Sequence, residues 1–152
     1  MLEFIEAQSH QNILLQDIVI ESKGYWGYSR EQLGIWRSSL KFEREYIANN
    51  IVKLITKDSK VIGFYALIIG DIDELDHFWL LPKAIGLGNG NIVFEQILKE
   101  CRTQNISEFF IVSDPDAAGF YAKKRAVLVG EVYSAQQNRM LPRLKFLVAC
   151  TK

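Results

Sequence analysis

The sequence has no excess of charge of either sign. Lys and Arg together number 18, Asp and Glu together also number 18, and the formal net charge is therefore zero. Apart from a short group near the end, Arg139, Arg143 and Lys145, no basic stripe interleaved with aromatic residues is present. Because nucleic-acid binding depends on many cations that neutralise phosphates, we expect no nucleic-acid partner.

Long apolar runs are also missing. The start of the chain, MLEFIEAQSH, lacks the basic end and the long apolar stretch of a signal peptide. The longest apolar stretches, such as VIGFYALIIG at 61–70, are far shorter than the roughly 20 residues that span a bilayer. We therefore expect a cytoplasmic protein with no membrane partner.

Cysteine is scarce. The sequence has only Cys101, in a helical pattern, and Cys150, two residues from the end. Two cysteines so placed match neither a disulfide framework nor a zinc-binding pattern. We expect buried or unreactive thiols and no metal site.

The composition is that of a folded domain. With 152 residues, of which 49% are hydrophobic, the chain would bury roughly 70% of its unfolded surface in a single core. No internal repeat, low-complexity tract or linker rich in Pro, Gly and Ser divides it. We therefore predict one domain over residues 1–152.

Apolar periodicity predicts two helices in the first part of the chain, after a short strand at 2–5. The first helix begins at about Asn12 and is broken by Gly24 and Gly27. Ser29 stands three residues before Gln32, which is the pattern of a capping box. A second helix is therefore predicted to begin at Ser29.

Strands dominate the middle of the chain. Three apolar runs at 51–57, 60–70 and 74–81 are separated by Asp58-Ser59 and Gly70-Asp71. Breaks of this length are typical of hairpins, so the three runs predict an antiparallel meander.

The remaining pattern alternates helices with strands. It predicts a helix at 91–105, a strand at 107–113, a short helix near Asp116, and strands at 126–134 and 144–150. The step from the strand at 74–81 through the long helix to the strand at 107–113 is a parallel βαβ unit. The predicted fold class is α/β, of the α+β type, with a mixed sheet of six to seven strands and helices on both faces.

A glycine-rich stretch, GLGNGN at 86–91, links the third strand of the meander to the long helix. The dinucleotide fingerprint G-x-G-x-x-G fails in both registers, at Asn91 and at Val93, and the phosphate-loop pattern fails because no Gly-Lys-Ser/Thr follows. Backbone N–H groups at a helix N-terminus could still bind a pyrophosphate. The alternative is a tight turn in which the glycines only relieve steric crowding.

Two motifs together indicate a family. ELDHFWLLPKAIGLGNGNIVFEQILKE, followed by SDPDAAGFYAKK, resembles the GCN5-related N-acetyltransferase family. The family's Q/R-x-x-G-x-G/A loop corresponds to residues 85–90. Its second motif, a turn with Asn or Asp before a helix that carries an aromatic pair, corresponds to Asp114, Ala117, Phe120 and Tyr121. The resemblance is strong over 61–133 and looser before that.

This resemblance implies acetyl-coenzyme A as co-substrate and a set of binding residues. The backbone of the strand end would pair with the pantetheine arm, and the glycine loop would hold the pyrophosphate. The cofactor-binding residues it implies are Leu80, Leu81, Gly86, Leu87, Gly88, Asn89, Gly90, Asn91 and Phe120. Tyr121 would be the general acid for the thiolate, since its ordinary pKa is near 10; the alternative is a packed tyrosine with its hydroxyl in water.

The base is left open. Glu74 and Asp76 share one face of a strand, and His77 faces the other way. Either carboxylate could take the proton of the acceptor amine, directly or through water, or both could be solvated residues near a strand end. His77 has a suitable ordinary pKa, but it could equally be a hydrogen-bonded structural histidine.

The chain departs from the family pattern in two places. Ile85 stands where Arg or Gln is usual, which predicts weaker anchoring of the cofactor. Arg125-Ala126 replaces Gly-Phe after the tyrosine helix, so either Arg125 adopts a left-handed conformation at a cost of roughly 1–2 kcal/mol or the helix ends differently.

The acceptor is predicted only by class. The resemblance places Tyr25, Trp26, Tyr28, Trp36 and Glu43 on the acceptor side, although aromatics at helical spacing are also typical of a core. We expect a small-molecule or peptide amine as acceptor, and the chain could form a homodimer. The alternative function is a catalytically weak or inactive sensor or interaction domain that binds an acyl-coenzyme A.

Overall fold

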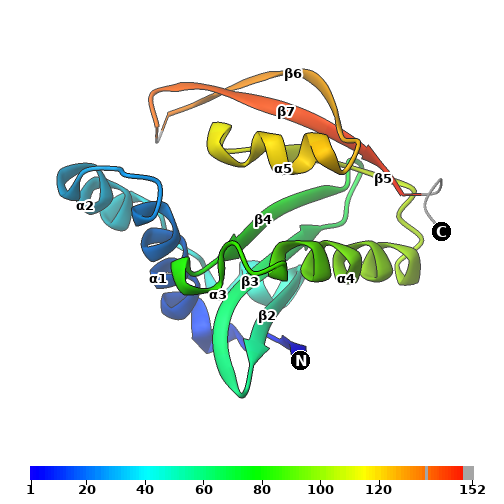
Figure 1. Ribbon diagram of the computed structural model, residues 1–152, viewed down its shortest axis with the longest axis horizontal. Helices are drawn as coiled ribbons and strands as arrows, with labels where there is room; N and C mark the ends of the chain where they lie inside the picture. The colour runs from blue at the N-terminus through cyan, green and yellow to red at the C-terminus, as the bar shows by residue number, and fades with distance from the viewer. Residues whose placement is uncertain (136, 149–152) are drawn as a thin grey trace. The chain divides into compact units, whose positions relative to one another are not determined.

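The computed structural model describes residues 1–135 and 137–148 (Figure 1). The strands are β1 (Leu2–Glu6), β2 (Ile51–Lys57), β3 (Lys60–Ile68), β4 (Glu74–Leu80), β5 (Glu108–Val112), β6 (Val127–Ser134) and β7 (Arg139–Leu147). The helices are α1 (Asn12–Gly24), α2 (Arg30–Ser39), α3 (Arg44–Asn49), α4 (Asn89–Thr103) and α5 (Ala118–Lys123). Three short 3₁₀ turns are η1 (Ser9–Gln11), η2 (Pro82–Ala84) and η3 (Pro115–Ala117).

The described strands form a seven-stranded sheet in the order β1-β2-β3-β4-β5-β7-β6. Its ladders are of both kinds, because β4 and β5 pair in parallel while β1 with β2, β2 with β3, β5 with β7 and β6 with β7 pair antiparallel. The predicted α/β class and mixed sheet are therefore confirmed. Within the described part of the chain, no helix is both long and apolar enough to cross a bilayer.

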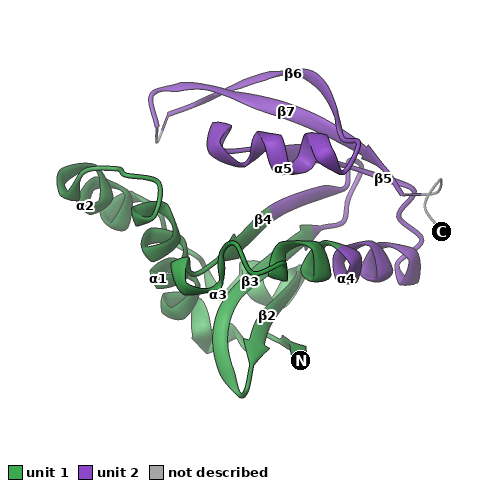
Figure 2. Cartoon of the chain, in the orientation of Figure 1, with its two compact units in different colours: residues 1–67, 77–94 green, residues 68–76, 95–152 purple. Residues whose placement is uncertain are grey.

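The chain divides into two compact units (Figure 2). The first unit contains residues 1–67 and 77–94, and the second contains residues 68–76 and 95–152. Both β4 and α4 continue from one unit into the other. The prediction of one domain over 1–152 remains a prediction.

The core of the first unit is built from α1, α3 and the β2–β3 hairpin. Leu15 of α1 and Phe64 of β3 are each 0% exposed and belong to one apolar cluster. The hairpin turns at Asp58 and Ser59, whose φ angles of 52° and 66° are the positive values that a tight two-residue turn requires. This turn confirms the predicted break between the two strands.

Helices α2 and α3 show what the sequence pattern could and could not predict. The Ser29 hydroxyl accepts a hydrogen bond from the Gln32 N–H at 3.0 Å, so α2 begins where the capping pattern indicated. Helix α3 was not predicted. It has six residues, its N-cap residue Glu43 makes no side-chain cap, and Ile47 is its only buried residue, so it has no apolar periodicity to detect.

The second unit contains the parallel pair that the sequence predicted. Glu74 of β4 lies opposite Phe110 of β5, and the Phe110 N–H donates to the Asp73 carbonyl at 2.9 Å. Strand β7 begins at Arg139, five residues before its predicted start. Pro142 and the basic residues interrupt its apolar pattern, and pairing with β6 from Ser134 opposite Arg139 extends it. Residues 149–150 of the predicted strand, including Cys150, lie outside the described residues.

Candidate active site

The glycine stretch forms a tight connection between β4 and α4. Strand β4 ends at Leu80, and Pro82, which has no N–H for a ladder, opens η2. Gly86 and Gly88 then take φ angles of +82° and +79°. L side chains rarely adopt this left-handed conformation, so the backbone path itself requires glycine at these two positions.

Helix α4 begins directly behind these glycines. Its first residue, Asn89, is 5% exposed, and the Asn89 amide donates to the Ala84 carbonyl at 3.0 Å, which closes the turn. The first N–H groups of a helix have no acceptor within the helix and carry partial positive charge. A Cβ atom built on Gly86 or Gly88 would meet nothing within 4 Å, so the turn presents open backbone at a helix N-terminus. Such a turn fits the pyrophosphate of a nucleotide cofactor.

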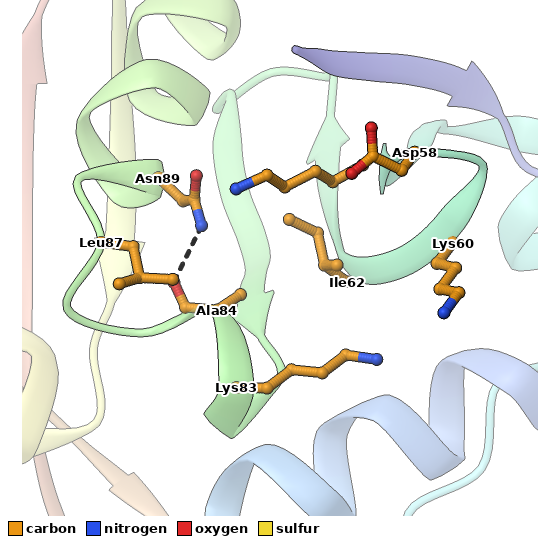
Figure 3. A pocket seen from close by; sticks show the side chains of 8 residues that line it. Asp58, Lys60, Ile62, Lys83, Ala84, Leu87 and Asn89 are labelled. Atoms are coloured by element: carbon orange, nitrogen blue, oxygen red, sulfur yellow. Dashed lines mark hydrogen bonds between the residues drawn. The ribbon is translucent and has the colours of Figure 1, made fainter.

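A cavity of about 300 Å³ lies beside this turn (Figure 3). It is formed by the β2–β3 hairpin, η2 and the start of α4. Its lining residues are Lys57, Asp58, Lys60, Ile62, Lys83, Ala84, Leu87 and Asn89. The cavity therefore combines apolar walls with three ammonium groups.

At the end of β4, backbone N–H and C=O groups point alternately toward β3 and away from it. The Leu81 N–H donates to the Ile62 carbonyl at 2.7 Å, and a Cβ on Gly63 would lie 2.1 Å from the Trp79 carbonyl oxygen. The Leu81 N–H and the Trp79 carbonyl therefore point toward β3, while the Leu81 carbonyl accepts a hydrogen bond from the Ala84 N–H at 2.8 Å. Because backbone groups alternate along a strand, the N–H and C=O of Leu80 point away from β3. Of the two residues predicted for pantetheine pairing, Leu80 has the suitable orientation, while the N–H of Leu81 is already used.

His77 lies in an aromatic cluster. Its ring centroid is 4.9 Å from that of Phe42, 5.7 Å from that of Phe64 and 6.3 Å from that of Tyr46. The indole N–H of Trp79 donates to His77 Nδ1 at 2.9 Å. In the neutral ring this bond assigns the proton to Nε2 and occupies the lone pair that would accept a proton. The geometry favours the structural role among the alternatives for His77.

The aromatic residues expected on the acceptor side divide into two groups. Trp36 is 3% exposed and packs against Tyr28, whereas Tyr25 and Trp26 are exposed and pack edge-to-face on each other. Trp36 and the half-buried Tyr28 lie next to Lys23, which is itself 6% exposed. Its ammonium lies 4.5 Å from the ring centroid of Trp36, 5.0 Å from that of Trp79 and 5.9 Å from that of Tyr28. These distances are typical of cation–π contacts. Glu43 is exposed and precedes α3.

In the second unit, Glu74 and Asp76 lie on β4 and are both half-buried. Burial raises the pKa of Glu74, the charge of Asp76 raises it further, and the Arg143 guanidinium opposes both effects. The influence of Asp76 agrees with two carboxylates on one face of the strand. A raised pKa makes Glu74 a stronger proton acceptor than an ordinary glutamate.

Tyr121 lies on α5 and is 6% exposed. Burial raises the pKa of its hydroxyl well above the ordinary value of a tyrosine. A tyrosine with its ordinary pKa is already protonated at neutral pH, so burial does not add to this; the raised pKa makes the hydroxyl a weaker acid than an exposed tyrosine. Its ring packs edge-to-face on Phe120, with 5.4 Å between the centroids.

Helix α5 ends with Arg125 in the left-handed conformation. This residue has φ of 73°, the left-handed conformation that glycine usually occupies. The Ala126 N–H donates to the Tyr121 carbonyl and the Arg125 N–H to the Ala122 carbonyl, both at 3.0 Å. This pair of bonds is a Schellman motif. The helix therefore ends in the way a glycine would end it, with arginine in the strained position.

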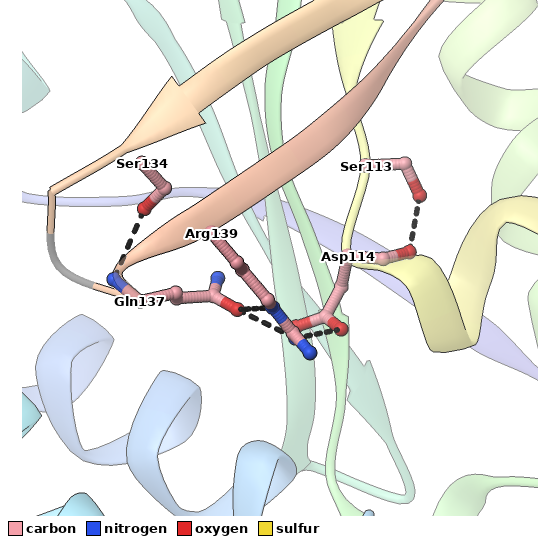
Figure 4. Close-up of polar contacts among 5 residues, drawn as sticks. All are labelled: Ser113, Asp114, Ser134, Gln137 and Arg139. Atoms are coloured by element: carbon pink, nitrogen blue, oxygen red, sulfur yellow. Dashed lines mark hydrogen bonds and ion pairs between the residues drawn. The ribbon is translucent and has the colours of Figure 1, made fainter.

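A polar network fixes the turn before α5 (Figure 4). Arg139 of β7 contacts the Asp114 carboxylate at 3.4 Å and also donates to the Gln137 side chain at 2.7 and 3.0 Å. The Ser113 hydroxyl donates to the Asp114 carbonyl at 2.7 Å. No sequence motif links Arg139 to Asp114, which lie 25 residues apart.

Comparisons with known proteins agree with this arrangement at the level of the fold. No profile of a protein family and no curated protein sequence matches the chain. Solved structures do match. They include a GCN5-related N-acetyltransferase from Rhodopseudomonas palustris, with 17% identity over 97% of this chain and 94% of the other and a TM-score of 0.74.

Two further solved structures hold the cofactor. The PaiA N-acetyltransferase from Thermoplasma acidophilum, in complex with coenzyme A, has 19% identity, covers 97% of this chain and 99% of its own, and gives a TM-score of 0.74. A GNAT-family acetyltransferase from Elizabethkingia anophelis with acetyl-coenzyme A bound has 12% identity, covers 96% and 97%, and gives a TM-score of 0.65. These likenesses show that the chain has the fold of the GCN5-related N-acetyltransferases.

Proposed function

We propose that the protein transfers an acetyl group from acetyl-coenzyme A to an amine. The observation that carries this proposal is the turn at Gly86 and Gly88, which opens the N-terminus of α4 in a chain with an acetyltransferase fold. Similar structures that contain coenzyme A or acetyl-coenzyme A support the choice of cofactor.

In this proposal the cofactor is held mainly by backbone. The N–H groups of residues 86–91 would bind the pyrophosphate, and the N–H and C=O of Leu80 would pair with the pantetheine arm. Phe120 would contribute an apolar contact. Ile85, which is half-buried, offers no hydrogen bond to the phosphates.

The chemistry requires a base, an oxyanion donor and an acid. Glu74 or Asp76 would take a proton from the acceptor ammonium, directly or through water, and the neutral amine would attack the thioester carbonyl. A second backbone N–H of this segment of β4, other than the one paired with pantetheine, would stabilise the negative oxygen of the tetrahedral intermediate. When the C–S bond breaks, the Tyr121 hydroxyl would give its proton to the coenzyme A thiolate.

The base is one of the two carboxylates in this proposal. His77 is disfavoured because its Nδ1 already accepts the hydrogen bond of Trp79. Glu74 is preferred over Asp76 because burial raises its pKa toward neutrality. The acceptor is proposed only as a small-molecule or peptide amine.

A thiol-release assay over a panel of small amines and peptide N-termini tests the proposal. Release of coenzyme A with at least one acceptor, at a rate above hydrolysis, would support it. Binding of acetyl-coenzyme A without release on any amine would instead favour the alternative of an acyl-coenzyme A sensor. The departures from the family pattern at Ile85 and Arg125-Ala126 are the reason for considering this alternative.

A further inference from the structure

The lysines of the cavity beside the glycine turn have no role in the proposed transfer. Lys57 and Lys60 lie opposite each other at the end of the β2–β3 hairpin, and Lys83 lies on η2. Because Asp58 and Ser59 form a tight turn with positive φ angles, both hairpin lysines are held at its base. Figure 3 shows the labelled Lys60 and Lys83 at this cavity.

The charges of these lysines are not neutralised within the described residues. Throughout 1–135 and 137–148, the side chains of Lys57, Lys60 and Lys83 form no ion pair or hydrogen bond, while the backbones of Lys57 and Lys60 pair in the β2–β3 ladder. Asp58 is the one acidic residue that lines the cavity. With three cations and one anion, the cavity has an excess of two positive charges and attracts a dianion.

We propose that this cavity binds the 3′-phosphate of coenzyme A through Lys57, Lys60 and Lys83. The proposal rests on the proposed function, since it names a second contact of the same cofactor. A phosphate monoester carries between −1.5 and −2 charges at neutral pH, which matches the excess of the cavity.

The location also fits this ligand. Leu87 and Asn89 line the cavity and belong to the turn that would hold the pyrophosphate. In coenzyme A the 3′-phosphate is separated from the pyrophosphate by a single ribose, so the two phosphate groups need neighbouring sites. The lysines would thereby replace the anchoring that Ile85 cannot give, because each adds a charge-assisted contact to phosphate.

Dephospho-coenzyme A, which lacks only the 3′-phosphate, is the probe that isolates this contact. Its affinity and that of coenzyme A are measured by calorimetry at low ionic strength. The variants are Lys57→Ala with Lys60→Ala, Lys83→Ala alone, and Lys41→Ala on an exposed residue outside the cavity, which removes one charge as Lys83→Ala does. Thermal melting checks that each variant is folded.

The wild-type protein should bind coenzyme A roughly tenfold more tightly than dephospho-coenzyme A, since each contact of an exposed lysine with the phosphate is weak and three of them act together. The double variant should lose most of this preference, Lys83→Ala should lose part of it, and Lys41→Ala should keep it. Equal affinity of the wild-type protein for both compounds, or a preference that survives in the variants, would overturn the inference alone. Failure to bind either compound would overturn the proposed function and this inference with it.

Discussion

The indole N–H of Trp79 donates to Nδ1 of His77 at 2.9 Å, inside a cluster of aromatic rings. This bond holds His77 in the tautomer with its proton on Nε2. The same indole ring forms one wall around the Lys23 ammonium, at 5.0 Å. His77, one of the candidate bases in the sequence, is thus packed among aromatic rings and hydrogen-bonded by Trp79.

Exchange of the carboxylate should therefore affect catalysis far more than exchange of the histidine. We expect Glu74→Gln to lower kcat by about 10²- to 10⁴-fold, since it removes a general base. His77→Gln, which keeps a side-chain acceptor for the indole, should change kcat by less than about tenfold. Both are measured by thiol release at saturating acetyl-coenzyme A.

The pH profile gives an independent check of the same assignment. The base must be deprotonated, and burial raises the pKa of Glu74 above that of an ordinary glutamate. Activity should therefore fall as the pH drops through this raised pKa. A profile whose acidic limb moves in His77→Gln and not in Glu74→Gln would show that the base is wrongly assigned.

Tyr121→Phe removes one hydroxyl from a buried ring. We expect kcat to fall by about 10²- to 10⁴-fold, because the thiolate loses its proton donor, while the affinity for coenzyme A stays within a few fold. Tyr133→Phe is the matched control, since Tyr133 is exposed on β6. Full turnover by the Tyr121 variant would exclude this residue as the acid.

Arg125→Gly should stabilise the fold slightly. Arginine in the left-handed region destabilises the folded protein by about 1–2 kcal/mol. Replacement by glycine removes this strain, but the larger backbone entropy of glycine in the unfolded chain offsets roughly 0.5–1 kcal/mol of the gain. The free energy of unfolding in urea should rise by up to about 1.5 kcal/mol. Lys124→Gly, at a neighbouring residue with φ of −85°, should not stabilise, and an equal gain there would contradict the explanation by strain.

Cys101 should make the fold sensitive to alkaline pH. Burial raises the pKa of this thiol to about 12, so above pH 9 the unfolded chain releases a proton that the folded chain retains. The contribution of the Cys101 thiol to the free energy of unfolding is complete below pH 9. As the pH rises from 9 toward 12, it falls by about 1.4 kcal/mol per pH unit.

The variant Cys101→Ala isolates this effect from other groups that titrate at high pH. Its free energy of unfolding should start lower at neutral pH, because a small cavity replaces the sulfur. Between pH 9 and pH 12 it should fall less steeply than that of the wild-type protein. Parallel slopes would mean that the thiol does not contribute.

Much of the fold could be predicted because its signals are local. Ser29 stands at the start of α2, Asp58-Ser59 at the β2–β3 turn, and the apolar period of α4 is visible in the sequence. The elements that the sequence did not predict lack such signals. Helix α3 is too short for a period, and the start of β7 depends on pairing with β6.

The candidate site was predictable to a smaller extent. The glycine turn follows from backbone conformation, and Gly86 and Gly88 have the positive φ angles that make glycine necessary there. The roles of side chains depend on their orientation in space. The bond between Trp79 and His77 and the contact between Arg139 and Asp114 join residues for which the sequence gives no pairing rule.

Titration calorimetry of the wild-type protein with acetyl-coenzyme A, coenzyme A and NAD tests the central claim most directly. The open turn at Gly86 and Gly88 and the lysines beside it predict saturable binding of both coenzyme A forms and no binding of NAD, whose fingerprint fails at Asn91 and Val93. Heat of binding with NAD and none with either form of coenzyme A would contradict the account.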